Sequence, residues 1–406
     1  MKAQKPFYIR NTCRCCDSSE LRMVLPMEPS PPGDEYLDSP DLETSPVAPM
    51  DVWQCRNCGH AQLRCVYNPE ILYGRFTYET QISLGLDNHF TEYADEAYSI
   101  AGLCHDDLVI DVGSNDGTLL SKFQKKGIKV HGVDPALQAA QKAIERGIPT
   151  TISFLTKDLA EGLLRDFGRP KLITTNNTFA NIDKLSNFIQ AIRHLMSRET
   201  IFCLETGYGP WIATKGLFET IYHEHLGYFS LRDLLNLMRI NGMVMQAASL
   251  NDSKGGCLRT YFRQGDASNL PIQAEKILFD EKEAAYTDGK PWESLGSKIQ
   301  NSKNDLKNYL EKKKGKIGSF GASVSTTTFL LNLGLDHWVS CLFDENPIKH
   351  GKFSPVGKIP VFGVSPRLAG CEVVIINAWR YRDSILKKHQ KINPRTHWLS
   401  VWPELI

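Results

Sequence analysis

The sequence predicts an α/β protein of several domains, in which a doubly wound parallel sheet lies between a small cysteine-rich unit and a second, smaller α/β unit. Two observations carry this prediction. The chain has 406 residues, of which 42% are hydrophobic, enough for two or three domains that each bury a core. Short apolar strands also alternate with helical segments in two separate stretches, as they do in parallel sheets. We expect boundaries that divide the chain into residues 1–85, 86–265, 266–315 and 316–406.

The charge balance excludes several classes of partner. There are 47 basic and 46 acidic side chains, so the formal net charge of +1 provides no overall field for nucleic acid or an anionic membrane. The N-terminus, MKAQKPFYIRNTCRCC, lacks the apolar stretch of a secretory signal, and no window approaches the roughly 20 apolar residues of a membrane span. We therefore expect a soluble, cytoplasmic protein with neither nucleic-acid nor membrane partners.

The cysteine-rich unit contains two closely spaced pairs, in the motifs C-R-C-C and C-R-N-C-G-H. Cys13 and Cys16, together with Cys55 and Cys58, would offer four thiolates, which complete a tetrahedral zinc shell and leave no open position for water or substrate. Cys15 is then a spare that could replace a neighbour. The segment between the pairs is rich in proline and is expected not to supply a hydrophobic core. We therefore expect a structural zinc to hold this unit together, with four free thiols as the alternative.

The middle domain is expected to begin with a helix and a βαβ unit, followed by further alternation and a closing antiparallel pair of strands. The first helix, strand, turn, helix and strand are expected at 86–103, 108–113, 114–117, 118–127 and 130–134. The later strands and helices are expected at 171–182, 187–197, 200–207, 231–243, 244–250 and 257–264.

The first strand-to-helix turn of this domain has the residues of a nucleoside site. Asp111, Gly113 and Asn115 lie where small residues let a ligand approach the backbone, at the carboxyl ends of parallel strands. Asp134 ends the second strand, where a carboxylate can accept the hydroxyl protons of a ribose. The turn lacks the G-x-G-x-x-G spacing for a pyrophosphate, which favours a nucleoside such as S-adenosylmethionine (SAM). A dinucleotide and a purely structural turn are the alternatives.

A second group of polar residues occurs in FETIYHEHLGYFS, where Tyr222, His223, Glu224 and His225 adjoin. A histidine beside a tyrosine and a glutamate is typical of proton transfer near neutral pH, because imidazole titrates there and its neighbours can orient it. A polar turn between helices and a second metal site are the alternatives.

The last two segments continue the α/β pattern. Residues 266–315 are rich in Lys, Glu, Asn and Gln at helical spacing, which predicts a solvated helical connector and not a basic binding patch. Residues 316–406 restart the alternation of strands and helices, beginning with the glycine-containing turn GSFGAS. These features predict the smaller α/β domain.

Several motifs in order resemble one family along essentially the whole chain: CxxC twice, DVGSNDGTLL, IYHEHLGYFS, GGCLR, GSFGAS and DENPIKHGKFSP. They look like the SAM-dependent sugar C-methyltransferases that act on nucleotide-linked ketosugars, the enzymes of branched deoxysugars such as tetronitrose or mycarose. The resemblance implies an N-terminal zinc-binding domain, a central Rossmann-like class I methyltransferase domain and a C-terminal α/β domain that helps enclose the nucleotide-sugar. It also implies that His225 acts as base, with Tyr222 and Glu224 beside it.

The resemblance and the strand order together suggest further contacts. The expected SAM contacts are Asp111, Gly113, Asn115, Asp134, Ser153, Phe154, Asn176 and Asn177. The expected substrate contacts are Tyr78, Asn181, His223, Lys254, Arg259, Ser323, Asn346 and Lys349.

The sequence departs from the family pattern at four positions. Asn181 stands where a histidine is common, and an amide cannot shuttle a proton at neutral pH although it can hold a carbonyl or hydroxyl. Phe76 removes one phenol of a Tyr-x-Tyr motif and leaves Tyr78. Lys254 replaces a frequent histidine, and Ser325 replaces a lysine after the C-terminal glycine turn.

The expected reaction follows from carbon acidity. A sugar C–H becomes acidic beside a carbonyl whose enolate is stabilised, so we expect a dTDP- or GDP-linked 4-ketosugar to lose its C3 proton to His225 and to take the methyl group of SAM. The alternatives are a ketosugar epimerase or isomerase that uses the same enolate, and a zinc-anchored nucleotide-binding protein. We expect a monomer or a weak homodimer.

Overall fold

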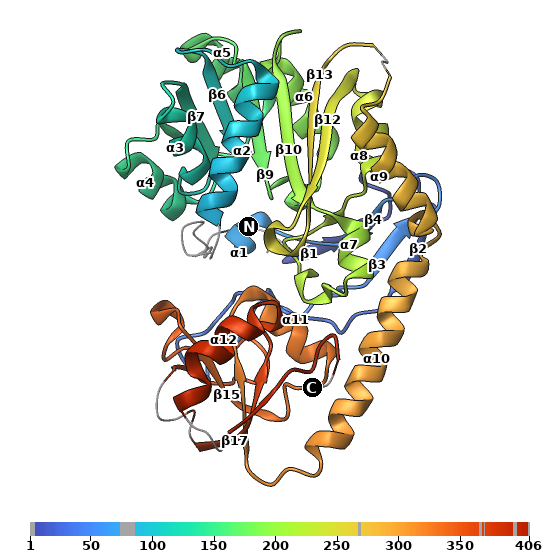
Figure 1. The fold of residues 1–406 in the computed structure, drawn as a ribbon, viewed down its shortest axis with the longest axis vertical. Helices are drawn as coiled ribbons and strands as arrows, with labels where there is room; N and C mark the ends of the chain where they lie inside the picture. Colours follow the sequence, from blue (N-terminus) through green and yellow to red (C-terminus); the bar gives the residue numbers. More distant parts are fainter. Residues whose placement is uncertain are drawn as a thin grey trace.

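The computed structural model describes residues 5–73, 86–266, 269–364, 368, 370–392 and 396–404. It has two lobes, each built around a sheet, and a long helix that runs along one side from the first lobe to the second (Figure 1). The N-terminal strands lie between the lobes. The C-terminus lies in the second lobe.

The N-terminal region forms two small antiparallel sheets. β1 (Phe7–Ile9) pairs with β5 (Cys65–Tyr67). The second sheet has the order β11-β4-β3-β2, with β2 at Leu21–Leu25, β3 at Val52–Cys55, β4 at Ala61–Leu63 and β11 at Gly227–Tyr228. Because β11 comes directly after the Tyr222–His225 motif, the middle of the chain supplies an edge strand to the cysteine-rich unit.

The proline-rich segment between the cysteine pairs does supply core residues, which corrects the expectation from the sequence. Met27, Tyr36 and Met50 are buried in one cluster with Trp292 of the connector and Leu330 of the C-terminal domain. The segment therefore borrows its core from other parts of the chain, which its own composition does not reveal. We call residues 26–50 the N-terminal strap.

The large sheet has seven strands in the order β12-β13-β10-β9-β6-β7-β8. The five strands from β10 to β8 are parallel, and β13 is antiparallel to both β10 and β12. The predicted βαβ unit and closing antiparallel pair are confirmed. The strands are β6 (Leu108–Val112), β7 (Lys129–Asp134), β8 (Thr150–Ile152), β9 (Leu172–Asn176), β10 (Ile201–Gly207), β12 (Met243–Asn251) and β13 (Cys257–Gln264).

Helices cover both faces of this sheet. Neighbouring residues of β6 belong to different cores: Val109 packs with the residues of α2 and α3, and Ile110 packs with those of α5, α6 and α8. This alternation is what a central parallel strand buried on both faces requires. The helices are α1 (Pro69–Tyr73), α2 (Leu86–Ala101), α3 (Thr118–Gln124), α4 (Leu137–Glu145), α5 (Lys157–Phe167), α6 (Leu185–Leu195), α7 (Gly209–Thr214) and α8 (Leu231–Ile240).

The connector consists of α9 (Ile272–Glu283) and α10 (Lys290–Leu310), the long helix of Figure 1. Five residues of α10 are buried, so the helix presents one apolar face to the core and one charged face to solvent. It is a packed connector and not a basic patch.

The second lobe has five parallel strands in the order β16-β15-β14-β17-β18. The strap crosses to this lobe, where Leu37 and Phe353 exchange backbone hydrogen bonds of 2.8 Å and Thr327 Oγ1 donates to the Gly33 carbonyl at 2.8 Å. The elements are β14 (Lys316–Phe320), β15 (Val339–Asp344), β16 (Val361–Gly363), β17 (Cys371–Ile376), β18 (His397–Leu399), α11 (Val324–Asn332) and α12 (Arg382–His389).

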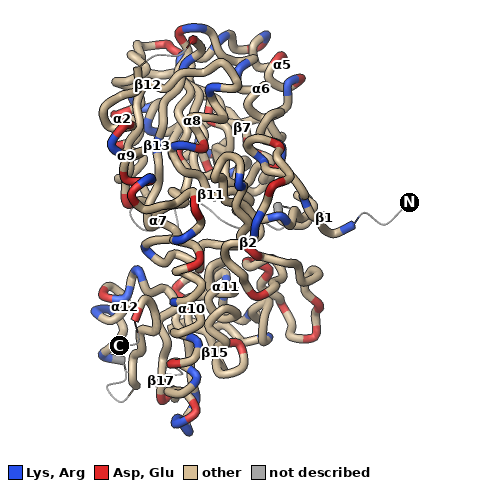
Figure 2. Tube along the Cα trace, turned by 90° about the vertical axis from the view of Figure 1, so that its right-hand side faces the viewer, with Lys and Arg blue, Asp and Glu red and all other residues tan. Residues whose placement is uncertain are grey.

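Basic and acidic residues are interspersed over both lobes (Figure 2). Within the described ranges, no helix is long and apolar enough to cross a membrane.

Candidate active site and cysteine cluster

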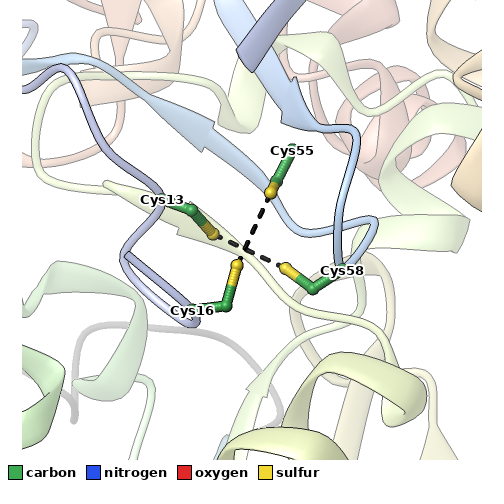
Figure 3. Close-up of side chains that lie close together, drawn as sticks. All are labelled: Cys13, Cys16, Cys55 and Cys58. Carbon is green, nitrogen blue, oxygen red and sulfur yellow. Dashed lines mark hydrogen bonds between the residues drawn. The ribbon is translucent and has the colours of Figure 1, made fainter. Parts of the chain in front are cut away.

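The four predicted cysteines converge on one point. The Sγ atoms of Cys13, Cys16, Cys55 and Cys58 all lie within 4.8 Å of one another, with the closest pairs at 3.5 and 3.6 Å (Figure 3). A tetrahedral zinc with Zn–S bonds of about 2.3 Å separates its sulfurs by about 3.8 Å. The donor set and its spacing therefore fit a zinc ion.

Amide donors support the sulfurs from outside the cluster. The Cys15 N–H donates to Cys13 Sγ at 3.4 Å, and Asn57 Nδ2 donates to Cys16 Sγ at 3.5 Å. The Cys15 side chain itself packs against the core of the middle domain, so it is not a ligand in this arrangement.

A cavity of about 890 Å³ opens at the carboxyl ends of β6, β7 and β9. All eight predicted SAM contacts line it: Asp111, Gly113, Asn115, Asp134, Ser153, Phe154, Asn176 and Asn177. This is the position at which doubly wound sheets bind their ligands.

The glycine turn approaches its neighbours too closely for any other residue. Gly113 has a φ of +82°, and a Cβ placed there would lie 2.0 Å from Thr178 Oγ1. Its N–H donates to the Val133 carbonyl at 2.7 Å, which ties the turn to β7. Glycine at this position therefore keeps the cavity floor open.

Two buried carboxyl groups lie on this floor. Asp134 accepts the N–H groups of Asn115 and Ala136, both at 2.8 Å, one on each carboxylate oxygen. Each oxygen retains a lone pair with which Asp134 could accept a ribose hydroxyl. Burial raises the pKa of Asp134, and burial raises that of Asp111 to about 7, opposed by the hydrogen bond from Thr174.

His225 is held as a neutral imidazole. The Thr220 carbonyl accepts from Nδ1 at 2.9 Å, so Nδ1 carries the proton and Nε2 accepts from the Tyr222 hydroxyl at 3.0 Å. Burial, with a smaller contribution from the charge of Lys254, lowers the pKa of His225 to about 4, and the hydrogen bond to Thr220 opposes this shift. His225 and Tyr222 are not among the cavity-lining residues, whereas Glu224 is.

Three buried polar atoms next to the cavity have no hydrogen-bond partner within the part of the chain that the structure describes. They are His223 Nδ1, Asn181 Oδ1 and Glu224 Oε2, and all three residues line the cavity. His223 donates from Nε2 to the Ser30 carbonyl at 2.9 Å, which leaves Nδ1 as an acceptor. Burial raises the pKa of Glu224 to about 7, so this carboxyl can donate a proton when neutral. The wall thus offers two acceptors and one group that can donate.

Lys254 enters the cavity from a strained turn. It has a φ of +50°, and the two glycines that follow it, Gly255 and Gly256, also have positive φ. Arg380 of the C-terminal domain donates to the Lys254 carbonyl at 2.6 Å and pairs with buried Glu219 at 3.3 Å. Backbone strain held by its surroundings is typical of functional positions.

Arg259 lies behind the cavity instead of lining it. It pairs with Glu205 at 2.7 Å and Glu96 at 2.6 Å, and Glu205 also accepts from His89 at 2.7 Å and from Asn176 Nδ2 at 3.2 Å. Through Asn176 this network supports the cavity wall.

The remaining predicted substrate contacts lie in the second lobe or outside the described residues. Ser323 caps α11, Asn346 caps the short helix after β15, and Lys349 pairs with Asp34 of the strap at 2.7 Å. None of these three lines the cavity. Tyr78 falls outside the described residues.

Two further residues that line the cavity, Tyr8 and Asp183, were not predicted from the sequence. They lie 175 positions apart and hydrogen-bond to each other. A charged residue two positions after Asn181 was the one available signal, and without its partner it looked like an ordinary surface aspartate.

Three family models match the chain in order. One described as "Putative zinc binding domain" matches residues 13–73, "Methyltransferase domain" matches 98–247, and "C-methyltransferase C-terminal domain" matches 252–401. The C-methyltransferase NovU from Streptomyces niveus is 26% identical over 389 residues, covering 93% of this chain and 92% of its own.

Solved structures are similar to about half of the chain. A SAM-dependent methyltransferase from Clostridium acetobutylicum has 11% identity, covers 48% of this chain and 96% of its own, and has a TM-score of 0.36. The magnesium protoporphyrin IX methyltransferase ChlM from Synechocystis, with bound S-adenosylhomocysteine, has 17% identity, covers 48% and 91%, and also has a TM-score of 0.36.

The sheet order, the cavity and the matched methyltransferase domain define a SAM-dependent methyltransferase with a Rossmann-like class I fold. Its cofactors are SAM and a structural zinc, for which four cysteines form the site. More particularly, the three matched domains and the similarity to NovU over 93% of the chain support a SAM-dependent C-methyltransferase.

Proposed function

We propose that this enzyme methylates C3, the carbon next to the ketone, of a nucleotide-linked 4-keto-deoxysugar. The observation that carries the proposal is the combination of the eight nucleoside-type residues with two buried acceptors, His223 Nδ1 and Asn181 Oδ1, in one cavity. A buried acceptor without a donor costs about 1–3 kcal/mol, so a ligand with hydroxyl groups at these points would be favoured. Sugar hydroxyls are such donors, and the similarity to the C-methyltransferase NovU supports transfer to carbon.

His225 is the base in this proposal. Its neutral ring, protonated at Nδ1, has one lone pair at Nε2, which the Tyr222 hydroxyl occupies in the described structure. Because neither His225 nor Tyr222 lines the cavity in the described structure, this role requires that the phenol turn away from Nε2 when the ketosugar binds, so that Nε2 can take the C3 proton. SAM, when bound, would supply the methyl group to the C3 carbanion that this deprotonation leaves, and its sulfur would keep the electron pair of the broken S–C bond.

The enolate oxygen needs a positive or donating partner. Lys254 lines the cavity as an ammonium, and neutral Glu224 can donate from Oε2, so both are suited to stabilise the charge that develops on this oxygen. Asn181 would hold a neighbouring hydroxyl without taking part in proton transfer.

The nucleotide half of the substrate is assigned to the second lobe. Ser323 and Asn346 lie after β14 and β15, at the carboxyl edge of a parallel sheet, where such sheets bind ligands. Lys349 adds a positive charge close to the strap, with its ammonium 4.3 Å from the centre of the Tyr36 ring.

The test is a mass-resolved assay with labelled SAM and a panel of dTDP- and GDP-linked 4-ketosugars. His225→Ala should lower turnover by about 10²–10⁴-fold, the usual contribution of a positioned base, with little change in SAM affinity. With S-adenosylhomocysteine in place of SAM, the wild-type enzyme should exchange the C3 proton with deuterium from solvent, and the variant should not. His105→Ala, in which the ring is exposed and lies outside the cavity, is the matched control.

Retained exchange in His225→Ala would move the base to another residue. Exchange without methyl transfer from SAM to any ketosugar would indicate an epimerase or isomerase. Absence of both reactions would refute the proposed function.

A further inference from the structure

One wall of the cavity is held from the cysteine-rich unit. Asp183, which lies two positions after Asn181 in the sequence, lines the cavity. Its carboxylate contacts three side chains that belong to the first 14 residues of the chain. Tyr8 donates its hydroxyl to Oδ2, Arg10 lies 3.4 Å from Oδ1, and Arg14 Nε lies 3.3 Å from Oδ1. Arg10 also donates to the Asp183 main-chain carbonyl at 3.2 Å, so both the side chain and the backbone of this residue are fixed.

Arg14 lies in the sequence between Cys13 and Cys16, the first cysteine pair. It follows Cys13 directly and is only 3% exposed. The backbone N–H of Arg14 donates to Gln62 Oε1 at 2.9 Å, and the guanidinium of Arg14 donates to the Leu63 carbonyl of β4. Its position therefore depends on the conformation that the cysteine pair adopts around the metal.

We propose that Arg14 is a positioning residue that couples the zinc site to the substrate wall at Asn181 and Asp183. For the identity of the substrate this inference rests on the proposed function, whereas the coupling itself does not.

The physical reason is the cost of a buried charge. A guanidinium removed from water requires an anion close to it, and Asp183 is the acidic partner that the described part of the chain gives Arg14. A shift of the cysteine pair would therefore move Arg14 and Asp183 together, and with them the Asn181 acceptor. Misplacement of a positioning group by about 1 Å can cost 10²-fold in rate.

The SAM side of the cavity is built differently. Gly113 follows β6 and Asp134 ends β7, and these two residues are fixed by contacts with Val133, Asn115 and Ala136. A change at Asp183 should consequently affect the substrate and the metal, and leave SAM binding unchanged.

The first experiment measures zinc release without any substrate. Asp183→Asn keeps the shape of the side chain and removes the charge that Arg14 faces. The rate at which the chelator 4-(2-pyridylazo)resorcinol takes zinc from the holoenzyme should rise about tenfold. Asp17→Asn is the matched control, because Asp17 pairs with Arg10 at 3.1 Å but is exposed, and its rate should stay within about twofold of wild type. Equal release rates for Asp183→Asn and wild type would overturn the coupling.

The second experiment separates substrate from cofactor. In Asp183→Asn, the KM for dTDP-4-keto-6-deoxyglucose or GDP-4-keto-6-deoxymannose should rise about tenfold or more, while the calorimetric Kd for S-adenosylhomocysteine stays within about twofold. Tyr8→Phe, which removes one contact to Asp183 and leaves Arg14 paired, should give a smaller change in the same direction. An equal loss of affinity for both ligands would mean general destabilisation and would refute the positioning role.

Methylation of the ketosugars and the rate of zinc release are independent measurements, so they test the proposed function and the coupling separately. If wild type methylates neither ketosugar but Asp183→Asn still releases zinc faster, the coupling stands and the substrate assignment falls.

Discussion

Asp134 offers the sharpest test of the cofactor site. The residue is 6% exposed, and each carboxylate oxygen accepts one backbone N–H, from Asn115 and Ala136, at 2.8 Å. Asp134→Asn preserves the shape but replaces one oxygen by an NH₂ group. The N–H group of either Asn115 or Ala136 then faces the new NH₂ group, which cannot accept its hydrogen bond. The negative charge of Asp134, which would attract a ribose hydroxyl, is also lost.

The magnitude follows from these contacts. A charge-assisted hydrogen bond from a SAM ribose hydroxyl is worth about 1.5–3 kcal/mol, so the Kd for SAM should rise about 10-fold to about 140-fold. The orphaned backbone donor should lower the free energy of unfolding by a further amount of about 1–3 kcal/mol. Destabilisation alone could lower the apparent affinity for SAM. A control variant is therefore needed that loses the same kind of backbone hydrogen bond outside the cavity.

The chain provides that control in its second lobe. Asp344 ends β15 and accepts the N–H groups of Ala322 and Asn346 at 2.6 and 2.7 Å, the same pair of contacts that Asp134 makes after β7. Asp344→Asn should lower the free energy of unfolding by a similar amount, yet it lies outside the cavity and should not change SAM affinity. Isothermal titration calorimetry with SAM and thermal unfolding of both variants measure the two effects.

The reasoning would be refuted if Asp134→Asn bound SAM as wild type does, because the ribose contact would then lie elsewhere. It would also be refuted if both variants lost SAM affinity equally, because the effect would then come from unfolding.

Three further outcomes are expected. Cys55→Ser should lose the zinc and unfold at lower temperature, because the binding energy of a structural zinc is also folding energy; unchanged metal content by mass spectrometry would contradict the four-cysteine site. Lys254→Met should raise the pKa of His225 from its value of about 4, because the charge of Lys254 is one of the causes that lower it. Turnover requires the neutral imidazole of His225, so the acid limb of the pH–kcat/KM profile should move to higher pH. An unmoved limb would show that the charge of Lys254 does not affect the pKa of His225. Gly113→Ala should lower the unfolding free energy by about 2 kcal/mol or more and weaken SAM binding, because its Cβ would clash. Gly102→Ala, also at positive φ but with open space around the Cβ, should cost only about 1 kcal/mol and leave SAM binding intact.

The elements that could be predicted are those whose signals are local. Asp111, Gly113 and Asp134 lie within one βαβ unit, so a short window of sequence predicts that they face one edge of the sheet. The same holds for Cys13 and Cys16, where the spacing itself predicts a ligand pair.

The contacts that could not be predicted join distant parts of the chain. Arg259 was expected to contact the substrate, but it pairs with Glu205 on the neighbouring strand β10, which the sequence around Arg259 does not indicate. The hydrogen bond from His223 Nε2 to the Ser30 carbonyl joins residues that lie 193 positions apart in the sequence. The N-terminal strap therefore orients this buried histidine of the Tyr222–His225 motif. A proline-rich composition signals irregular structure but does not tell whether such a segment is covered by other domains.

The pairing of β11 with β4 has a consequence for protein engineering. Gly227 and Tyr228 pair with Gln62 and Ala61, so one sheet is assembled from segments that the family models assign to separate domains. A methyltransferase domain expressed alone would expose an unpaired strand next to its own Tyr222–His225 motif, and such an edge invites aggregation. Chimeras among relatives should therefore exchange the first 73 residues together with residues 220–230, and a single junction placed between the zinc-binding match and the methyltransferase match should yield insoluble protein.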